Sequence, residues 1–168
     1  QLIASHHYLG YNHPVGEHLK YIIFSRARPI ACMAWSSAPR HLGPRDRYIG
    51  WSPEQRKANL RFVAYQTRFL ILPWVEGKNL ASQILSHAAR KVPDLWQQRY
   101  GYKPWLLETF VEKQRFAGTC YKAANWILTG QTKGRSRNDR DRTIQVPPKD
   151  VYVYPLIKNF RKRLCYDA

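Results

Sequence analysis

One segment near the middle of the chain constrains the fold most, because it joins a short apolar run to a helix of clear periodicity. Residues 68–72 are almost wholly apolar, as expected of a strand that is covered on both faces, and Pro73 ends the run. Asn79 then predicts a helix N-terminus, behind which apolar residues recur at helical spacing. These residues are Leu80, Ala81, Ile84, Leu85, Ala88 and Ala89. A buried strand that leads into such a helix indicates a sheet with helices packed on it.

The remaining patterns also alternate between strand and helix. Further strands are expected at residues 20–24, 30–35, 105–111, 126–130 and 151–154. Further short helices are expected at 94–100, 120–125 and 160–164. The Pro and Gly residues of 36–51 predict a loop. The class is therefore α/β, with a mixed central sheet and flanking helices, in one domain that spans residues 1–168.

Ser52 marks the start of another helix by three local rules. Its hydroxyl can cap the helix, Pro53 suits the first helical position, and Gln55 completes a capping box. This helix is expected over 52–66, with an apolar side toward the core. The residues on that side would be Leu60, Val63 and Ala64.

The charge of the chain is its most unusual bulk property. Twenty-eight Lys and Arg residues against eleven Asp and Glu residues give a net charge of +17 and a pI near 10.2. An enzyme of a neutral metabolite gains nothing from such self-repulsion, whereas a binder of phosphate backbones gains salt-dependent affinity. The sequence contains no basic amphipathic helix and no apolar run of about 18 residues, and either feature would have indicated a membrane. We therefore expect a nucleic acid partner and no membrane.

Cysteine usage indicates a reducing compartment. Cys32, Cys120 and Cys165 are widely spaced and form no Cys-x-x-Cys pair, which suggests neither a disulfide framework nor a thiolate zinc site. No signal peptide opens the chain, so a cytoplasmic location is expected. Because the chain begins with Gln1 rather than Met, the domain can have been trimmed from a longer protein.

Two runs of basic residues, over 133–142 and near the C-terminus, form the strongest electrostatic feature. Their cations are Lys133, Arg135, Arg137, Arg140, Arg142, Lys158, Arg161, Lys162 and Arg163. We expect them to contact nucleic acid phosphates, although a charge run can also be a solvated face. Trp51, Trp74 and Tyr102 are candidates for stacking on the unpaired bases of a single strand; each can also be a core residue.

Eight blocks of residues, in order along nearly the whole chain, resemble one family. They are HYLG at 7–10, RD at 45–46, IGWS at 49–52, RFLILPWV at 68–75, NLAS at 79–82, ETFV at 108–111, GTCYKAANW at 118–126 and TKGR at 132–135. This series resembles the DruA family, which takes its name from the Druantia anti-phage defence system and is also found near or within transposase-like proteins. The family usually has Asn where this chain has Gln66 and Asp where it has Glu112. The resemblance implies DNA-directed work in defence or mobile-element biology, with helicase or transposase-like proteins as possible partners.

A second resemblance concerns the fold. Residues 72–85 are similar to the strand, glycine-rich turn and helix with which acetyltransferases of the GNAT superfamily hold coenzyme A. Residues 121–130 are similar to their later Tyr-x-x-x-Gly-Phe segment. In that superfamily the glycines let backbone N–H groups close on the pyrophosphate, but Asn79 and Ala81 stand at those places here. The resemblance therefore implies a GNAT-like scaffold with the acyl-carrier site lost, and no cofactor is expected.

Glu108 is a candidate general acid or base. It lies inside the apolar strand expected at 105–111, where alternation places it on one face with Leu106 and Phe110. Burial raises the pKa of a carboxyl group toward the range useful at neutral pH. The alternative is a structural salt bridge to one of the many cationic side chains.

Tyr121 is the candidate nucleophile. It begins a short expected helix just after Gly118, and a helix N-terminus favours both a phosphate and a phenolate. Such a tyrosine could attack a phosphodiester or act as an acid, or could be a phenol hydrogen-bonded in the core. Because Glu108 lies on the preceding strand, we expect both side chains to open into the same crevice. Cys120 suits acyl chemistry better than phosphodiester cleavage.

His7 and Arg45 complete the candidate catalytic set. His7, in the His-rich residues 1–19, suits a proton shuttle or a phosphate contact, or is a solvated loop residue. Arg45 beside Asp46 is either held ready for a phosphate or staples a loop through an ion pair. The spacing of the histidines and Glu17 matches no metal signature, so no metal site is expected, with a divalent metal left open.

These features predict a DNA-binding domain that cleaves or rejoins single-stranded DNA. Tyr121 would be the nucleophile or acid, Glu108 and His7 would transfer protons, and arginines would hold the phosphates. Two alternatives stay open: a non-catalytic DNA-binding module that serves a helicase or transposase partner, and a GNAT-type acyltransferase.

Overall fold

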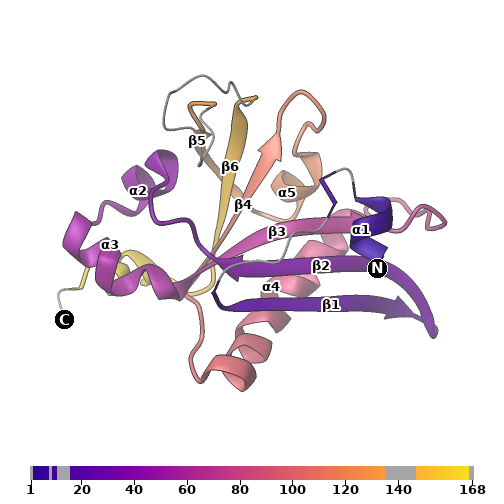
Figure 1. Ribbon diagram of the computed structural model, residues 1–168, viewed down its shortest axis with the longest axis horizontal. Coiled ribbons are helices and arrows are strands. Elements are labelled where there is room, and N and C mark those ends of the chain that lie inside the picture. The colour runs from indigo at the N-terminus through magenta and orange to yellow at the C-terminus, as the bar shows by residue number, and fades with distance from the viewer. Residues whose placement is uncertain (1, 8, 11–15, 135–146, 167–168) are drawn as a thin grey trace.

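The computed structural model describes residues 2–7, 9–10, 16–134 and 147–166 (Figure 1). At its centre is a six-stranded sheet with the order β1-β2-β3-β4-β6-β5. The strands are β1 (His18–Ser25), β2 (Arg28–Ser37), β3 (Val63–Ile71), β4 (Leu106–Glu112), β5 (Ile127–Gln131) and β6 (Lys149–Pro155). Neighbours are antiparallel except for β3 and β4, which are parallel. The predicted α/β class with a mixed sheet is confirmed.

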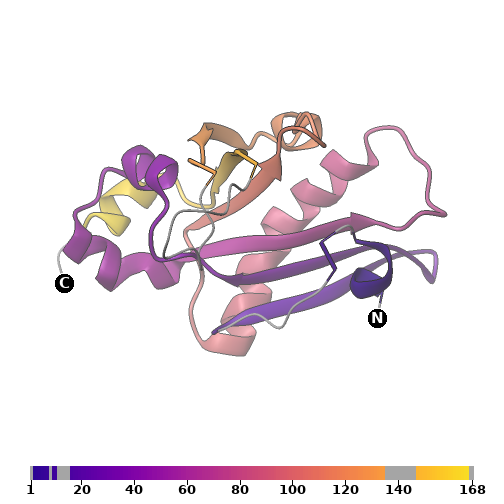
Figure 2. The ribbon, with the colours of Figure 1, turned by 45° about the horizontal axis from the view of Figure 1, so that its top comes forward.

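Helices cover both faces of this sheet (Figure 2). One face carries the long helix α4 (Leu80–Tyr100) and the short helix α5 (Thr119–Ala123). The other carries α1 (Leu2–His6), α2 (Gly43–Ile49), α3 (Pro53–Asn59), the 3-10 turn η1 (Leu60–Phe62) and α6 (Phe160–Leu164). No helix in the described ranges is both long enough and apolar enough to cross a bilayer.

Each face has its own apolar core, and adjacent strand residues alternate between them. The α4 core joins Leu85, Val92 and Trp96 of α4 to Trp35 and Leu107 of the sheet. The α6 core joins α2 and α6 to the strand residues that point the other way, so that Leu106, for example, belongs to this core and Leu107 to the α4 core. Its buried members include Ile49, Val63, Leu106, Val153, Phe160 and Leu164.

The helix start at Ser52 is confirmed, but the helix ends earlier than predicted. Ser52 accepts from the N–H of Gln55, and the Gln55 side chain accepts from the N–H of Ser52, which completes the capping box. The expected helix over 52–66 is wrong beyond Asn59, because β3 begins at Val63. Val63 and Ala64 are buried as expected, one in each core, because strand alternation replaces the helical face.

Two further expectations about helices are wrong. Residues 43–49 of the predicted loop form α2, because Pro44 occupies the first turn, where a helix tolerates proline, and Gly50 ends the helix at a φ of 84°. The helices expected on either side of Pro93 are a single helix, α4, because its buried stripe continues through Val92 and Trp96. Asn79 does precede α4, but its φ of 60° is left-handed and its side chain makes no capping hydrogen bond.

The parallel strands diverge after a short stretch of pairing. Residues 63–66 of β3 pair with residues 106–109 of β4. Beyond this stretch, β3 pairs only with β2, and β4 pairs only with β6. The carboxyl ends of parallel strands are where α/β proteins commonly bind ligands, so this divergence bears on function.

Candidate functional site

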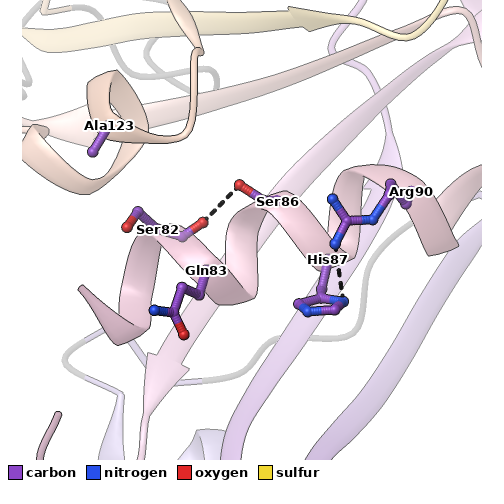
Figure 3. Close-up of a pocket in the computed structure, with 6 residues that line it drawn as sticks. All are labelled: Ser82, Gln83, Ser86, His87, Arg90 and Ala123. Carbon is purple, nitrogen blue, oxygen red and sulfur yellow. Dashed lines mark hydrogen bonds between the residues drawn. The ribbon is translucent and has the colours of Figure 1, made fainter. Parts of the chain in front are cut away.

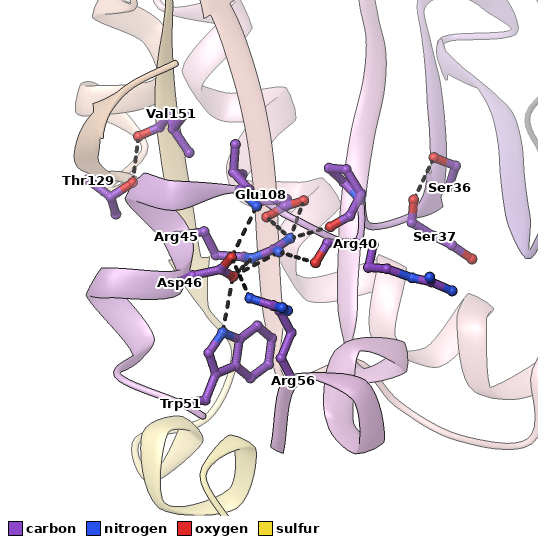
Figure 4. A network of polar contacts seen from close by, with 12 residues as sticks. Ser36, Ser37, Arg40, Arg45, Asp46, Trp51, Arg56, Glu108, Thr129 and Val151 are labelled. Atoms are coloured by element: carbon purple, nitrogen blue, oxygen red, sulfur yellow. Dashed lines mark hydrogen bonds and ion pairs between the residues drawn. The ribbon is translucent and has the colours of Figure 1, made fainter. Parts of the chain in front are cut away.

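Arg45 and Glu108 meet in the interior, although they are 63 positions apart (Figure 4). Arg45 reaches from α2 to β4, and its Nη1 donates to both carboxylate oxygens, at 3.2 Å to Oε1 and 3.1 Å to Oε2. The same nitrogen donates to the carbonyl of Pro39 at 3.0 Å. Both charged side chains are fully buried. Glu108 is therefore part of a structural salt bridge, the alternative interpretation of this residue.

Asp46 holds the other side of the Arg45 guanidinium. Its Oδ1 accepts from Arg45 Nε at 2.9 Å and from Trp51 Nε1 at 3.0 Å. Its Oδ2 accepts from the backbone N–H of Leu42 at 3.1 Å and from Arg56 at 3.3 Å. Arg45 is thus held between two carboxylates with no exposed surface. This arrangement is the ion pair given as the alternative interpretation of Arg45, and a phosphate contact by this residue stays untested.

The protonation of Glu108 reflects its burial. Burial raises the pKa of Glu108 to about 7, although the Arg45 guanidinium opposes the rise and the negative charge of Asp46 adds to it. Such a pKa is common in catalytic carboxyl groups. Glu108 has no exposed surface, however, so a ligand reaches it only if α2 moves away from the sheet.

Tyr121 lies on the opposite side of the sheet. Its ring belongs to the α4 core, 5.3 Å from the Trp126 ring and 5.6 Å from the Tyr152 ring. Its hydroxyl donates to Gln66 Oε1 at 2.6 Å. Tyr121 is therefore a phenol hydrogen-bonded in the core, as its alternative interpretation had it.

Strand register shows why Tyr121 and Glu108 do not meet. Across β4 and β6, Glu108 pairs with Val153, whereas Tyr152, which stacks on Tyr121, pairs with Thr109. Because successive strand residues point to opposite faces, Glu108 faces α2 and the Tyr121 cluster faces α4. The expected shared crevice is wrong: Glu108 lies in mid-strand rather than at a strand end beside α5.

His7 is separate from both residues. It follows α1, which Figure 1 places at the opposite end of the strands from α2. Partial burial, with Arg68 nearby, lowers the pKa of His7 to about 4, so the imidazole is neutral at pH 7. The predicted set of Tyr121, Glu108, His7 and Arg45 therefore forms no single catalytic site. Within the described ranges, no group of three or more His, Cys, Asp or Glu side chains is placed to hold a metal ion.

Helices α3 and α6 lie side by side at one end of the molecule (Figure 2), and we name the exposed cations on them, on η1 and in the turn before α6 the α6 surface. These cations are Lys57 of α3, Arg61 of η1, Lys158 in the turn just before α6, and Arg161, Lys162 and Arg163 of α6. Glu54 is the one carboxylate in these three elements, all of whose residues are described. The predicted nucleic-acid-binding residues of α6 are thus exposed together with cations from two other elements.

The other predicted nucleic-acid contacts lie elsewhere. Lys133 is exposed beyond β5, whereas Arg135, Arg137, Arg140 and Arg142 lie outside the described residues. Trp74 is 42% exposed in the turn after β3, where its Nε1 donates to the carbonyl of Pro29 and its ring meets His6 edge to face. It is therefore beside α1 and not on the α6 surface. Trp51 is buried.

The turn before α4 is where a GNAT-like protein would hold the phosphates of coenzyme A. Asn79 adopts the left-handed conformation that glycine favours but keeps a side chain there, and Glu76 adds an exposed carboxylate. Where β3 and β4 diverge, the hydrogen bond between Tyr121 and Gln66 joins α5 to β3, with both side chains buried. A carboxylate and a side chain in a left-handed turn both disfavour a bound pyrophosphate. The expectation that the acyl-carrier site is lost stays a prediction, which these residues support.

A polar hollow of about 360 Å³ lies along α4 (Figure 3). It is lined by Ser82, Gln83, Ser86, His87 and Arg90 of α4 and by Ala123 of α5. Arg90 Nη2 lies 3.2 Å from His87 Nδ1, and none of the six lining residues is acidic. The hollow suits a small anionic group, but it lies on the face of the sheet opposite α6 and contains no predicted site residue.

Three residues that shape these sites were not predicted to have a role. Gln66 was noted only as a departure from the family, yet it is the hydrogen-bond partner of Tyr121. Phe62 and Trp105 stack beneath exposed arginines of the α6 surface. The available signal was the interleaving of aromatic and basic residues over 99–105 and at Arg61-Phe62.

Sequence comparison identifies one family. A family model described as Druantia protein DruA matches residues 1–145. None of the curated proteins matches the chain in sequence.

Comparison with solved structures identifies the fold. An N-acetyltransferase from Staphylococcus aureus aligns over 83% of this chain and 68% of its own, with 11% identity and a TM-score of 0.51. The structure of yncA from Salmonella typhimurium with acetyl-CoA aligns over 84% and 66%, with 10% identity and a TM-score of 0.52. That of AAC(6')-Ib with ribostamycin and coenzyme A aligns over 90% and 70%, with 15% identity and a TM-score of 0.52. The chain spans about two thirds of each of these proteins. The likeness confirms the GNAT-like fold and, at these identities, nothing finer.

Proposed function

The chain belongs to the DruA family, which connects it with anti-phage defence, and on that premise we propose that this domain binds DNA as a non-catalytic module. The α6 surface would contact the phosphate backbone, and a helicase or transposase-like partner would act on the strand. The observation that carries the proposal is the group of exposed cations on α3, η1, α6 and the turn at 156–159, segments in which Glu54 is the one carboxylate. None of these cations forms an ion pair within the part of the chain that the structure describes, and such an excess of cations on one surface supports binding to a polyanion.

The anchoring of α6 also supports the proposal. Gln55 Nε2 donates to the carbonyl of Cys165 at 2.7 Å, and Asn59 Nδ2 donates to the carbonyl of Leu164 at 3.0 Å. On its inner side, α6 buries Phe160 and Leu164 in the α6 core. A helix held in this way fixes the backbone positions from which its cations extend, so less backbone entropy is lost when DNA binds.

Strand cleavage by the predicted catalytic set has no support from the geometry. Tyr121 and Glu108 lie on opposite faces of the sheet, both buried and both engaged in hydrogen bonds. A nucleophile and its general base need to lie within hydrogen-bond reach of one reacting group. The non-catalytic module is therefore the form of DNA binding that the arrangement favours.

Charge reversal on the α6 surface tests the proposal. Lys57→Glu, Lys158→Glu and Lys162→Glu change three exposed lysines of this surface. We expect the combined variant to bind labelled oligonucleotides at least about tenfold more weakly, because each lost phosphate contact also reduces counterion release. Fluorescence anisotropy at constant ionic strength measures the affinity.

The matched control reverses three exposed lysines elsewhere, with Lys78→Glu, Lys91→Glu and Lys113→Glu. Both variants have the same net charge, so a difference between them reports position rather than total charge. Equal affinities for the two variants would mean that DNA does not bind at the α6 surface. An absence of DNA binding by the parent would contradict the proposal as a whole.

A further inference from the structure

Two arginines of the α6 surface lie at the ends of a column of aromatic rings. Within the column, the Phe62 and Trp105 rings stack with centroids 3.7 Å apart and an interplanar angle of 7°, and Tyr102 meets Phe62 edge to face at 5.5 Å. The Arg163 guanidinium carbon lies 5.5 Å from the centre of the Trp105 ring. That of Arg61 lies 4.1 Å from the centre of the Tyr102 ring. The order is arginine, three rings, arginine.

The two guanidinium groups are open to solvent. Arg61 and Arg163 are both exposed, and neither forms an ion pair with a carboxylate in the described part of the chain. A guanidinium that rests on an aromatic ring uses one flat side for that contact. Arg61 also hydrogen-bonds the Tyr102 hydroxyl, and because a guanidinium has five N–H donors, each exposed arginine keeps donors that can meet a phosphate while its plane meets a second planar group.

The rings are held by backbone hydrogen bonds of the sheet. The N–H of Trp105 donates to the carbonyl of Phe62 at 2.7 Å, and the N–H of Leu156 donates to the carbonyl of Trp105 at 2.9 Å. These bonds join the starts of β3 and β4 to the end of β6. The Tyr102 hydroxyl donates to Glu17, so all three rings are anchored before any ligand arrives, which lowers the entropic cost of stacking another ring on the column.

We propose that this arginine-capped column binds the unpaired bases of single-stranded DNA. A base stacks on the free flat side of Arg163 or Arg61, and the N–H edges of the same guanidinium reach a neighbouring phosphate. A duplex offers its phosphates to this surface but not its base faces, which are stacked on each other. The inference rests on the proposed function and names the substrate class of the same surface.

An abasic oligonucleotide separates base stacking from phosphate contact, because it keeps the phosphates and lacks the bases. We expect the parent to bind a mixed-sequence single strand about tenfold more tightly than an abasic strand of equal length. Arg61→Lys with Arg163→Lys keeps both charges and removes both planar groups. This double variant should lose the preference for bases while keeping its affinity for the abasic strand. Arg28→Lys with Arg90→Lys, at two other exposed arginines, is the matched control and should keep the preference.

The outcomes distinguish this inference from the proposed function. Salt-dependent binding with equal affinity for normal and abasic strands overturns the inference and leaves DNA binding in place. A base preference that survives in the Arg61→Lys, Arg163→Lys variant also overturns it. No binding to either strand contradicts the proposed function itself. A base preference lost only in the α6-surface variant supports both.

Discussion

Arg45 is the residue whose role is clearest from its contacts. Its guanidinium is fully buried between Glu108 and Asp46, and it joins α2 to the centre of the sheet. Replacing both members of a buried ion pair by apolar groups often costs little, whereas removing one leaves a charge without its partner. The importance of Arg45 therefore depends on the presence of Glu108.

Arg45→Met is expected to lower the free energy of unfolding by about 3 kcal/mol or more near neutral pH, because it leaves Glu108 buried without its cation. Denaturant unfolding measures the change. Arg56→Met, which removes a more exposed partner of Asp46, is the control and should cost about 1 kcal/mol or less. Adding Glu108→Leu to Arg45→Met should recover much of the loss. Unchanged stability of Arg45→Met would contradict this account.

The cost of Arg45→Met should also grow as pH rises. Burial raises the pKa of Glu108 from 4.5 to about 7. Because the unfolded chain then releases this proton more readily than the folded one, the free energy of unfolding of the parent falls as pH rises through that range. Arg45 opposes the rise, so the pKa of Glu108 is higher still in the variant, where the loss continues at higher pH. The difference in free energy of unfolding between the parent and Arg45→Met should therefore be larger at about pH 9 than at about pH 6. Denaturant unfolding of both proteins at the two pH values measures it.

Tyr121→Phe tests the assignment of this residue to the core. The variant removes the hydroxyl that donates to Gln66 and leaves a buried amide with one fewer partner, at a cost of about 1–2 kcal/mol in stability. Its affinity for DNA should match that of the parent, because Tyr121 is not on the α6 surface. A covalent DNA adduct formed by the parent and absent in Tyr121→Phe would instead identify Tyr121 as a nucleophile.

At the scale of elements, sequence prediction succeeded where the signal is local. The capping box of Ser52 and Gln55, the strand over 105–111 and the helix after Asn79 each depend on neighbours a few residues away. Prediction failed where a distant contact decides. Val63 and Ala64 continue a helical pattern in sequence but become part of β3, because β2 and β4 pair with them.

The candidate site was predictable only in part, for the same reason. The exposed cations of α6 form a continuous run, so the sequence alone identifies them. The pairing of Arg45 with Glu108 spans 63 positions, and the face on which Tyr121 lies is set by the packing of α5. The column of Phe62, Tyr102 and Trp105 combines two segments that only the sheet brings together.

The residues of the turn before α4 lead us to expect no tight binding of coenzyme A. With Asn79 and Glu76 in the turn, and with Tyr121 bonded to Gln66 at the divergence of β3 and β4, calorimetry should detect no acetyl-coenzyme A binding tighter than about 1 mM, roughly −4 kcal/mol. A micromolar dissociation constant would contradict this prediction. It would assign the phosphates to this turn or to the hollow beside Arg90, and would favour acyl transfer.

At the scale of the whole molecule, charge and fold have separate consequences. The GNAT-like fold supplies a rigid sheet with a core on each face, and this framework alone does not determine function. The net charge of +17 does bear on function, because part of this charge is concentrated on the α6 surface, where it favours binding to a polyanion. Family membership connects the chain with anti-phage defence, and the surface specifies the contact through which we propose it acts.

The salt dependence of DNA binding tests the central claim most directly. The affinity of the parent for a single-stranded oligonucleotide would be measured between about 50 and about 200 mM salt. If the six cations of the α6 surface contact phosphates, the affinity should fall by about 10²-fold or more over this range, with a linear dependence of log K on log salt concentration. The Lys57→Glu, Lys158→Glu, Lys162→Glu variant should show a shallower slope. An affinity of the parent that changes less than about twofold would contradict the claim that this domain binds DNA through its phosphates.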